Sequence, residues 1–579
     1  MAEVLLSPGV LARENDQSFI ASTPIPAGAA IAGPTVKGPV NIPTIVTSYS
    51  DYKTKFGAIV ESGSLEYTYF TSLAAYNFFQ QGGDSLLVTR VASGSFTGAS
   101  AESGGTDGIV NGDSVSAFKL ETLDVGTITN STGSEGVNNT LSNGTKNNLR
   151  WEVTGVNSGS GTFSLLIRRG DDTITRKTVL EQYTDVSMDP NSDNFVSKVI
   201  GDQTQTVQSD GSTYYLQITG SYPNRSQLVR VSSVDTPTLN YFDNNGTAKT
   251  ALTSSVPVVG SGSFGGATGT PFDGIEANFY NTINGGTGTA ANTQGVVAAN
   301  YTTALNLLAN VDEFQYNVLS VPGIYKDDYS STVTTVIDNC QERGDAIAVV
   351  DMVAYSKNIG DVTTEASGID SSYAATYWPW VQTICPDLGN QCWVPASTLI
   401  PAVYAFTDAS SAAWFAPAGL NRGGLSTVIR AERKLTNGNR DTLYTGNVNP
   451  IATFPNTGVV VFGQKTLQKK ASALDRVNVR RLLIALKGFI SQIADNLVFE
   501  QNTIATRNNF LSQVNPYLAS VQQRQGLFAY QVVMDESNNT PDTIDRNQLV
   551  GQIYLQPTKT AEFIYLDFNV LPTGATFPS

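Results

Sequence analysis

Histidine, the side chain that most often moves protons in catalysis, is absent from this sequence of 579 residues. Its absence excludes Ser-His-Asp and Cys-His nucleophile pairs and HExxH zinc sites. Paired carboxylates, as in glycosidases, remain possible. Asp351 ends an apolar run, where α/β enzymes often place a catalytic acid, but no second motif accompanies it. We therefore expect Asp351 to form a turn or a cap, and we expect no enzyme activity and no catalytic, cofactor-binding or metal-binding residues.

The cysteines and the glycine-rich runs predict no reactive site either. Cys340, Cys385 and Cys392 form neither a CxxC motif nor an even disulfide set, so we expect buried, reduced thiols made in a cytoplasm. Runs such as residues 265–270 lack the lysine of a phosphate-binding loop and suit ordinary loops better. The sequence begins without the features of a signal peptide, and no stretch of about 18 apolar residues occurs. We expect no membrane contact by this chain.

A cluster of basic residues is the strongest indication of a binding surface. Between residues 465 and 487, Asp475 is the only acid, in a chain whose net charge is −15. This local reversal of charge favours contact with a negatively charged partner. The alternative is a solvated helix face that neutralises nearby acids. The basic residues are Lys465, Lys469, Lys470, Arg476, Arg480, Arg481 and Lys487.

An amphipathic helix must position most of this cluster. A buried strand over residues 459–462 precedes it, and Ser472 with Asp475 fits a capping box, with Asn478 as a possible later cap. At about 100° per residue, the apolar side chains of the helix fall on one stripe. The stripe consists of Val479, Leu482, Leu483, Leu486, Ile490, Ile493 and Leu497.

The composition divides the chain into several domains. Residues 25–92 read as short strands around a helix over residues 65–81. Residues 93–299 are rich in Gly, Ser, Thr and Asn, with short alternating strands that predict an inserted all-β module.

In residues 300–445, the pattern of strand, helix and strand over residues 316–351 predicts a parallel pair with a crossover helix, with a turn at residues 322–323. Residues 446–560 combine the basic helix, a second helix with an internal Pro516, and strands.

The two ends of the chain differ from the predicted domains. Residues 1–24 cannot form a core alone and are either a disordered terminus or an arm that orders against a neighbour. In residues 561–579, a segment alternates with strict period two, as in a half-buried strand. This strand is either the edge of its own sheet or a strand donated to another subunit. Its inward-facing set is Ile564, Leu566, Phe568 and Val570.

Several blocks in order resemble contractile tail sheath proteins, as in bacteriophages with contractile tails. Near the C-terminus these are NPI, GVVVFG.KTL, DRVNVRRLL and VFEQN, and in the middle YAATYWPW, VPAS and TDAS.AAWFAPAG. Near the N-terminus they are SPGV followed by an acidic residue, then FG, FF.QGG and LLVTRV. The resemblance covers roughly residues 1–95 and 300–579.

The resemblance implies a fold with a discontinuous α/β sheath core, inserted β-rich outer domains, and extended N- and C-terminal arms. The arms would carry Pro8, Gly9 and Val10 at one end and the alternating strand at the other, and would complete a small sheet in neighbouring subunits. The domains would be an N-terminal arm (1–24), a first core part (25–92), the outer module (93–299), an α/β domain (300–445), a tube-facing domain (446–560) that presents the basic residues, and a C-terminal arm (561–579).

The resemblance also implies a function. The chain would polymerise as stacked six-fold rings around a tail tube, in a metastable extended state, and contract to drive the tube through the host envelope. It would be assembled in the host cytoplasm into the virion tail sheath, and its other partners would be baseplate and tail terminator proteins.

Three alternatives stay open from the sequence. A β-rich virion adhesin or glycan-degrading protein would use the Gly/Ser/Thr-rich module. A nucleic-acid-binding structural protein would use residues 465–487, although the acidic overall charge argues against nucleic acid as a partner. Within the family, the chain could serve a bacteriocin or a secretion-type injection machine.

Overall fold

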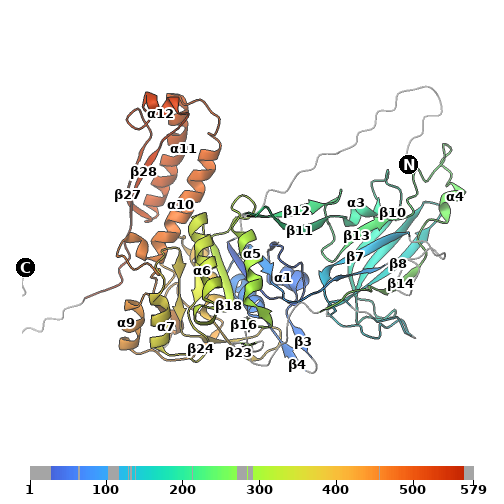
Figure 1. The fold of residues 1–579 in the computed structure, drawn as a ribbon, viewed down its shortest axis with the longest axis horizontal. Helices are drawn as coiled ribbons and strands as arrows, with labels where there is room; N and C mark the ends of the chain where they lie inside the picture. The colour runs from blue at the N-terminus through green and yellow to red at the C-terminus, as the bar shows by residue number, and fades with distance from the viewer. Residues whose placement is uncertain are drawn as a thin grey trace, which may run out of the picture.

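The computed structural model describes residues 28–565 except 63–64, 102–116, 128, 131–132, 137, 212, 270–282, 285–290 and 456. Figure 1 shows a central α/β body with a β-rich module at one end of the long axis. A pair of long helices with a hairpin projects from the body at the other end. The fold is therefore mixed α/β and multidomain with several small sheets, as the sequence predicts.

The central body is built on a six-stranded sheet with strand order β2-β5-β1-β18-β19-β20. β2 runs antiparallel to β5, and all other neighbouring pairs are parallel. The strands are β1 (Ala29–Gly33), β2 (Thr44–Val46), β5 (Leu86–Arg90), β18 (Val318–Tyr325), β19 (Ile347–Asp351) and β20 (Ala374–Ala375). Strands from two distant parts of the chain thus share one sheet.

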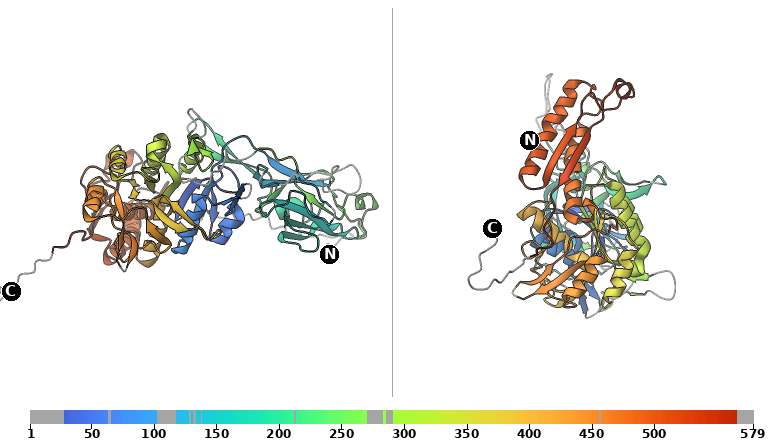
Figure 2. Two further views of the ribbon diagram at one scale, coloured as in Figure 1. Left: turned by 90° about the horizontal axis from the view of Figure 1, so that it is seen from below. Right: turned by 90° about the vertical axis from the view of Figure 1, so that its left-hand side faces the viewer.

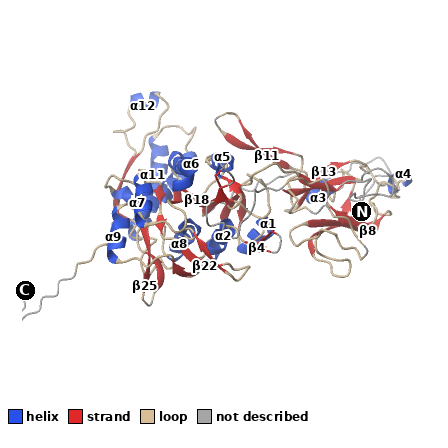
Figure 3. Cartoon of the chain, turned by 60° about the horizontal axis from the view of Figure 1, so that its bottom comes forward, coloured by secondary structure: helices blue, strands red, loops and turns tan. Residues whose placement is uncertain are grey.

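Helices cover both faces of this sheet, which explains why β1, β5 and β19 are buried at every position. α5 and α6 pack together on one face, and α2 and α8 pack together on the other (Figure 3). The helices of the body are α1 (Tyr49–Phe56), α2 (Phe70–Gln80), α5 (Tyr301–Leu308), α6 (Lys326–Arg343), α7 (Ile359–Ser367), α8 (Ile400–Ser410) and α9 (Asn437–Thr445). The predicted crossover is confirmed, because β18 and β19 are parallel and α6 connects them.

Two local predictions in the body are wrong. The turn expected at Pro322–Gly323 lies inside β18, where the backbone of Gly323 adopts a φ of +92° and the register with β19 shifts. The irregularity is absorbed within the strand and does not end it. The helix expected over residues 65–81 begins at Phe70, because Leu65–Tyr67 forms β4, the partner of β3 (Val60–Ser62) in a hairpin.

The β-rich module has its own hydrophobic cluster, separate from that of the body. A four-stranded sheet, β10-β9-β8-β14, and a three-stranded sheet, β13-β7-β6, contribute the buried residues. These strands are β6 (Gly98–Ala101), β7 (Phe118–Val125), β8 (Leu149–Asn157), β9 (Thr162–Arg169), β10 (Val179–Ser187), β13 (Val229–Val234) and β14 (Gly260–Ser263). None of the described residues between Gly98 and Ser263 joins the six-stranded sheet.

Smaller elements complete the module and the body. The module also contains the hairpin β11-β12 (Thr204–Ser209 and Tyr214–Thr219) and helices α3 (Val196–Ile200) and α4 (Thr250–Thr253). A small sheet of β15 (Ile283–Asn284), β16 (Ala291–Thr293) and β17 (Val296–Val297) lies at the body, where Val296 joins the hydrophobic cluster of the central sheet. The body has two further sheets, β21-β25-β26 and β23-β22-β24. Their strands are β21 (Tyr377–Trp378), β22 (Val381–Ile384), β23 (Gln391–Val394), β24 (Val428–Ala431), β25 (Asn449–Phe454) and β26 (Gly458–Val461).

The projecting part consists of α10 (Val477–Asp495), α11 (Ile504–Gln523), the hairpin β27-β28 (Leu527–Val533 and Gln552–Pro557) and α12 (Pro541–Asp545), as Figure 2 shows from the side. Their apolar side chains form a third hydrophobic cluster. The predicted capping box is wrong: Ser472 caps a 3-10 turn (Ala473–Asp475), and α10 begins after Arg476 without a side-chain cap. α11 continues through Pro516. Across the described residues, no helix is both long and apolar enough to cross a bilayer.

Asp351 acts as a cap in the structure, as predicted. Its carboxylate is buried at the end of β19 and accepts hydrogen bonds from the Ser397 backbone N–H (3.1 Å) and from the Ser397 hydroxyl. Ser397 belongs to the 3-10 turn Ala396–Thr398 that leads into α8. Burial raises the pKa of the Asp351 carboxyl to about 7, and the hydrogen bonds from Ser397 offset only part of that rise.

Asp351 should make stability fall as the pH rises from about 4 to about 7. The folded protein holds the Asp351 proton over this range, whereas the unfolded chain, with a pKa of 3.8, has lost it. Replacing Asp351→Asn should flatten this part of the curve when denaturation midpoints are measured between pH 4 and pH 8. The exposed Asp193→Asn is the control. Equal slopes in Asp351→Asn and the unmodified protein would contradict this assignment.

Candidate functional site

The basic residues predicted to form one face differ in burial, and the difference follows residue type. Lys469, Lys470 and Lys487 are exposed, whereas Arg480 and Arg481 are only 4% and 5% exposed. Arg476 and Lys465 are half-buried. The expectation of one continuous basic face is therefore corrected: only the three lysines are fully exposed.

The two buried arginines join α10 to the body. The Arg480 guanidinium lies 3.9 Å from the centre of the Tyr373 ring and donates a hydrogen bond to the Ser372 hydroxyl. Arg481 lies 4.5 Å from the centre of the Tyr404 ring in α8 and forms an ion pair of 2.5 Å with Asp408. A planar, weakly hydrated guanidinium can stack on an aromatic ring and donate hydrogen bonds at its edge, which makes its burial tolerable.

Arg476 and Lys465 meet at Tyr444, a residue of α9. The Lys465 ammonium donates to the Tyr444 carbonyl (2.7 Å) and lies 4.5 Å from the centre of its ring. Burial and the nearby charge of Arg476 together lower the pKa of Lys465. Arg476 forms an ion pair with Asp475 (3.0 Å) and a second with Glu562. These two cations are thus already bound within the chain.

Most of the predicted arm residues lie outside the described residues. Pro8, Gly9, Val10, Leu566, Phe568 and Val570 belong to this group. Ile564 is described: it is 76% exposed and lies in irregular backbone, as do all of residues 558–565, which we call the C-terminal strap. In its described part, the predicted terminal strand is therefore not formed as an edge of the chain's own sheets.

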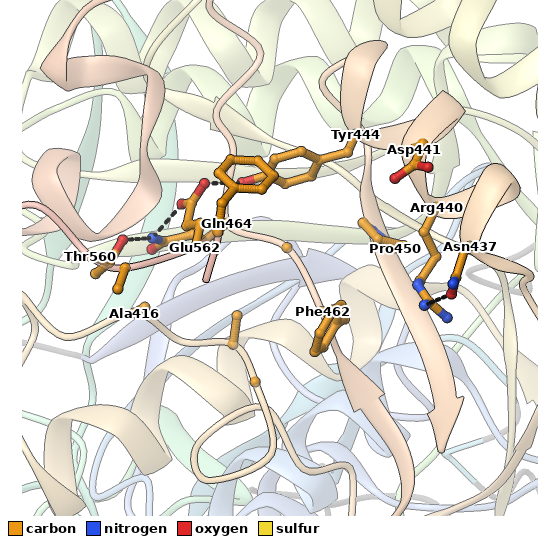
Figure 4. Close-up of a pocket in the computed structure, with 15 residues that line it drawn as sticks. Ala416, Asn437, Arg440, Asp441, Tyr444, Pro450, Phe462, Gln464, Thr560 and Glu562 are labelled. Carbon is orange, nitrogen blue, oxygen red and sulfur yellow. Dashed lines mark hydrogen bonds between the residues drawn. The ribbon is translucent and has the colours of Figure 1, made fainter. Parts of the chain in front are cut away.

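Glu562 fixes the strap to the body (Figure 4). Its carboxylate accepts a bidentate pair of hydrogen bonds from Arg476, at 2.7 Å from Nε and 2.9 Å from Nη2. It also accepts from the Tyr444 hydroxyl (2.8 Å) and from the Gln464 amide (3.0 Å), which donates to Thr560 as well (2.7 Å). We call this group the Glu562 clamp. It draws together α9, the segment after β26, and the residue immediately before α10.

The clamp holds Glu562 in its charged form. Burial alone would raise the pKa of the Glu562 carboxyl, but the hydrogen bonds from Arg476, Tyr444 and Gln464 together outweigh burial and hold its pKa below the usual value. For Arg476, burial acts to lower the pKa, but the bonds to Glu562 and the nearby acids leave it raised. The lowered pKa of Glu562 and the raised pKa of Arg476 both favour the charged form, as expected for a bidentate ion pair that is partly shielded from water.

Directly after the clamp the strap leaves the body. Phe563, Ile564 and Tyr565 are 68%, 76% and 88% exposed. Hollows of about 500 Å³ and about 620 Å³ lie on its two sides, the first against α9 and the second against the residues that precede α10. The strap therefore depends on the few polar contacts of the clamp, because much of the surface beside it is open.

The hairpin β27-β28 forms a narrow sheet beside the base of the strap. Tyr530, Val532, Ile553 and Leu555 face the hydrophobic cluster of α10 and α11 but are only half-buried. On the outer face, Phe528 and Tyr554 are 75% and 56% exposed. Within the described part of the chain, neither strand pairs with a third strand. Two strands alone are a marginal sheet, and both outer edges can accept another strand.

Sequence reasoning missed the clamp and the open sheet. Glu562 shows no local motif, and Tyr444 and Gln464 lie 118 and 98 residues away from it. Among the described residues, no group of three or more acids or cysteines is placed to hold a metal ion. The site is built for contact between chain segments.

Two family models match the second half of the chain. Residues 294–467 match the model of the phage tail sheath protein central domain, and residues 469–571 match the phage tail sheath C-terminal domain. The tail sheath protein of Vibrio phage KVP40 is 39% identical over 217 residues, which cover 38% of this chain and 31% of that protein. The tail sheath protein of Enterobacteria phage T4 is 35% identical over 230 residues, which cover 40% of this chain and 35% of that protein.

The chain thus spans about a third of the length of these two relatives. A solved structure of the sheath complex of an extracellular contractile injection system in its contracted state is 27% identical. That match covers 47% of this chain and 75% of the other, with a TM-score of 0.41.

The Glu562 clamp should stabilise the protein at neutral pH and lose its effect in acid. Because the pKa of Glu562 is below 4.5 when folded, the stabilisation is complete above that pH and disappears as the pH falls through the lowered value. Glu562→Gln, which leaves Arg476 without a charged partner in the strap, should cost about 1–3 kcal/mol at pH 7. The melting temperatures of Glu562→Gln and the unmodified protein should differ at pH 7 and converge as the pH falls through the lowered pKa of Glu562. Exposed Glu500→Gln serves as the control, and a difference that persists in acid would count against the clamp.

Proposed function

Because the chain belongs to the contractile tail sheath protein family, we propose that it is the repeating subunit of a phage tail sheath. Subunits would assemble as stacked six-fold rings around a tail tube, in a metastable extended state, and contract to drive the tube through the host envelope. The chain would be part of the virion tail, with baseplate and tail terminator proteins at the two ends of the polymer. A structural role of this kind requires no catalytic residue.

The open hairpin β27-β28 is the observation that supports this proposal most directly. Among the described residues it offers two free edges, and its own side chains that face α10 and α11 are only half-buried. A strand from a neighbouring subunit would extend the sheet by main-chain hydrogen bonds and cover that apolar surface. In the same subunit the three residues directly after Glu562, at positions 563–565, are exposed. Each subunit would therefore give a strand and receive one.

The alternating segment after the strap is suited to be the donated strand. Ile564, Leu566, Phe568 and Val570 would face the receiving helices, with polar or aromatic residues between them. A donated strand forms several main-chain hydrogen bonds worth about 1 kcal/mol each, in addition to buried apolar area. Exposed ion pairs contribute only about 0–1 kcal/mol each. The arms would thus persist while charged contacts between subunits exchange, and they would act as hinges.

Contraction in this scheme needs no nucleotide. The energy would be stored during assembly as the difference between two packings of the same subunit. The chain's hydrophobic clusters belong to separate parts, the body, the β-rich module and the α10–α11 unit. Such parts can move as rigid units when interfaces repack. The module would lie on the outside of the sheath, away from the tube.

The exposed lysines of the basic cluster would make the contact with the tube. Lys469, Lys470 and Lys487 are exposed and can meet a negatively charged partner, and within the described residues their one side-chain hydrogen bond is a long one of 3.4 Å from Lys487 to the Tyr373 hydroxyl. Arg476, Arg480 and Arg481 are bound within the chain. Three exposed ammonium groups give a weak, salt-sensitive attachment. A weak attachment suits a sheath that must release the tube when it contracts.

Removing residues 564–579 should give a folded monomer that cannot polymerise. The truncation keeps Glu562 and therefore the clamp, so the body should retain its melting temperature. A shorter truncation of residues 572–579 keeps the alternating segment and should still polymerise. Negative-stain microscopy and sedimentation measure both outcomes. Normal tubes from the longer truncation would refute the donated strand.

Replacing Lys469, Lys470 and Lys487 by Glu should impair assembly on the tube but leave tube-free polymers intact. All three side chains are exposed, so the melting temperature should change little. The control is the triple reversal of exposed Arg176, Arg225 and Lys434, which changes the net charge by the same amount. Co-sedimentation with the tube should fall only in the first variant, and equal loss in both would point to net charge instead of a local contact.

A further inference from the structure

A hollow of about 260 Å³ opens where the described chain begins. Gly28 lies at its edge. The ring of Phe78 from α2, together with Val318, Pro401 and Tyr404, gives it an apolar lining. α2, β18 and α8 supply these residues, so the hollow lies between the core sheet and the two helices that pack together on one of its faces.

The edge of the hollow is polar and not fully satisfied. Asp84, Asp408 and Arg481 lie around it. Arg481 donates from Nη2 to Asp408, but its buried Nη1 atom has no hydrogen-bond partner among the described residues. A buried donor without a partner is costly, and a main-chain carbonyl placed beside it would remove that cost.

The sequence that directly precedes Gly28 fits this hollow. It reads Thr23-Pro24-Ile25-Pro26-Ala27, with one large apolar side chain between two prolines. Each proline fixes its own φ and restricts the residue before it to extended backbone. Ile25 is three residues from Gly28, within about 10 Å along an extended chain, so its side chain can reach the hollow.

We propose that residues 23–27 of the same chain dock in this hollow. Ile25 fills the apolar lining, and a carbonyl of the segment accepts a hydrogen bond from Arg481. An aliphatic side chain gains by leaving water for such a lining, and the two prolines reduce the conformational entropy that docking costs. The occupant is the chain's own segment because its described end already lies at the edge of the hollow.

The docking has a consequence for the proposed arms, and only this consequence rests on the proposed function. The N-terminal arm would comprise only the residues before Thr23. It would start beside Arg481, as the C-terminal strap starts beside Arg476. Both arms would then leave from positions fixed by arginines at the start of α10.

Thiol accessibility in the monomer tests the docking. In a Cys392→Ser background, where Cys340 and Cys385 are buried, Ala27→Cys should react with a thiol reagent about tenfold more slowly than Ala21→Cys, and both variants keep Ile25. That factor corresponds to a segment that is docked about nine-tenths of the time. Adding Ala409→Trp, at an exposed position that lines the hollow, should fill it and bring the Ala27→Cys rate up to that of Ala21→Cys.

Hydrogen exchange on the unmodified chain gives an independent measurement. The amides of Ile25 and Ala27 should exchange more slowly than those of residues 19–22, and Ala409→Trp or Ala405→Leu should abolish the difference. Equal thiol rates and equal exchange in the monomer would overturn the proposal. Protection that appears only in polymers would also overturn it, because the occupant would then be a segment of a neighbouring copy. Neither measurement depends on assembly. The docking can therefore be refuted while the sheath function stands, and the sheath function can be refuted while the docking stands.

Discussion

The pairing of β1 with β18 is the contact on which the rest of the structure depends. It joins residues near the start of the chain to residues almost three hundred positions later, and β1 also pairs with β5. The strand reads Ala-Ala-Ile-Ala-Gly, and these small residues allow helices to approach both faces. At Gly33 a Cβ atom would come within 2.4 Å of the Thr71 hydroxyl in α2. A larger residue there would push α2 away from the sheet.

The second constraint is the difference between arginine and lysine in residues 465–487. Ammonium groups are strongly hydrated and stay at the surface, as Lys469, Lys470 and Lys487 do. Guanidinium groups stack on Tyr373 and Tyr404 and bind acids, so they tie α10 to the body. A single stretch of basic residues therefore serves two purposes. The arginines stabilise the junction within the chain, and the lysines stay at the surface, where a partner can reach them.

The parts that the sequence predicted depend on local periodicity. β1, β5, β19 and the crossover from β18 through α6 were predictable because buried parallel strands appear as continuous apolar runs. The basic face was predicted wrongly because charge alone does not reveal that Tyr373 and Tyr404 accept two of its arginines. The clamp could not be predicted, since Glu562 meets Tyr444 and Gln464 only through the tertiary fold. The open edges of β27-β28 likewise become evident only when the sheet's other strands are known.

The position of α10 links these observations to the proposed mechanism. Arg476 precedes its first turn and binds the strap through Glu562, and Arg481 lies five residues later, about 7.5 Å along the helix axis, at the hollow beside Gly28. The same helix contributes Leu482 and Leu486 to the cluster under the open hairpin. One rigid element thus contacts the departing C-terminal segment, the place where the described chain begins, and the surface that would receive a neighbour's strand. A shift of α10 relative to the body would move all three together, which is how repacking in one subunit would be transmitted to the next.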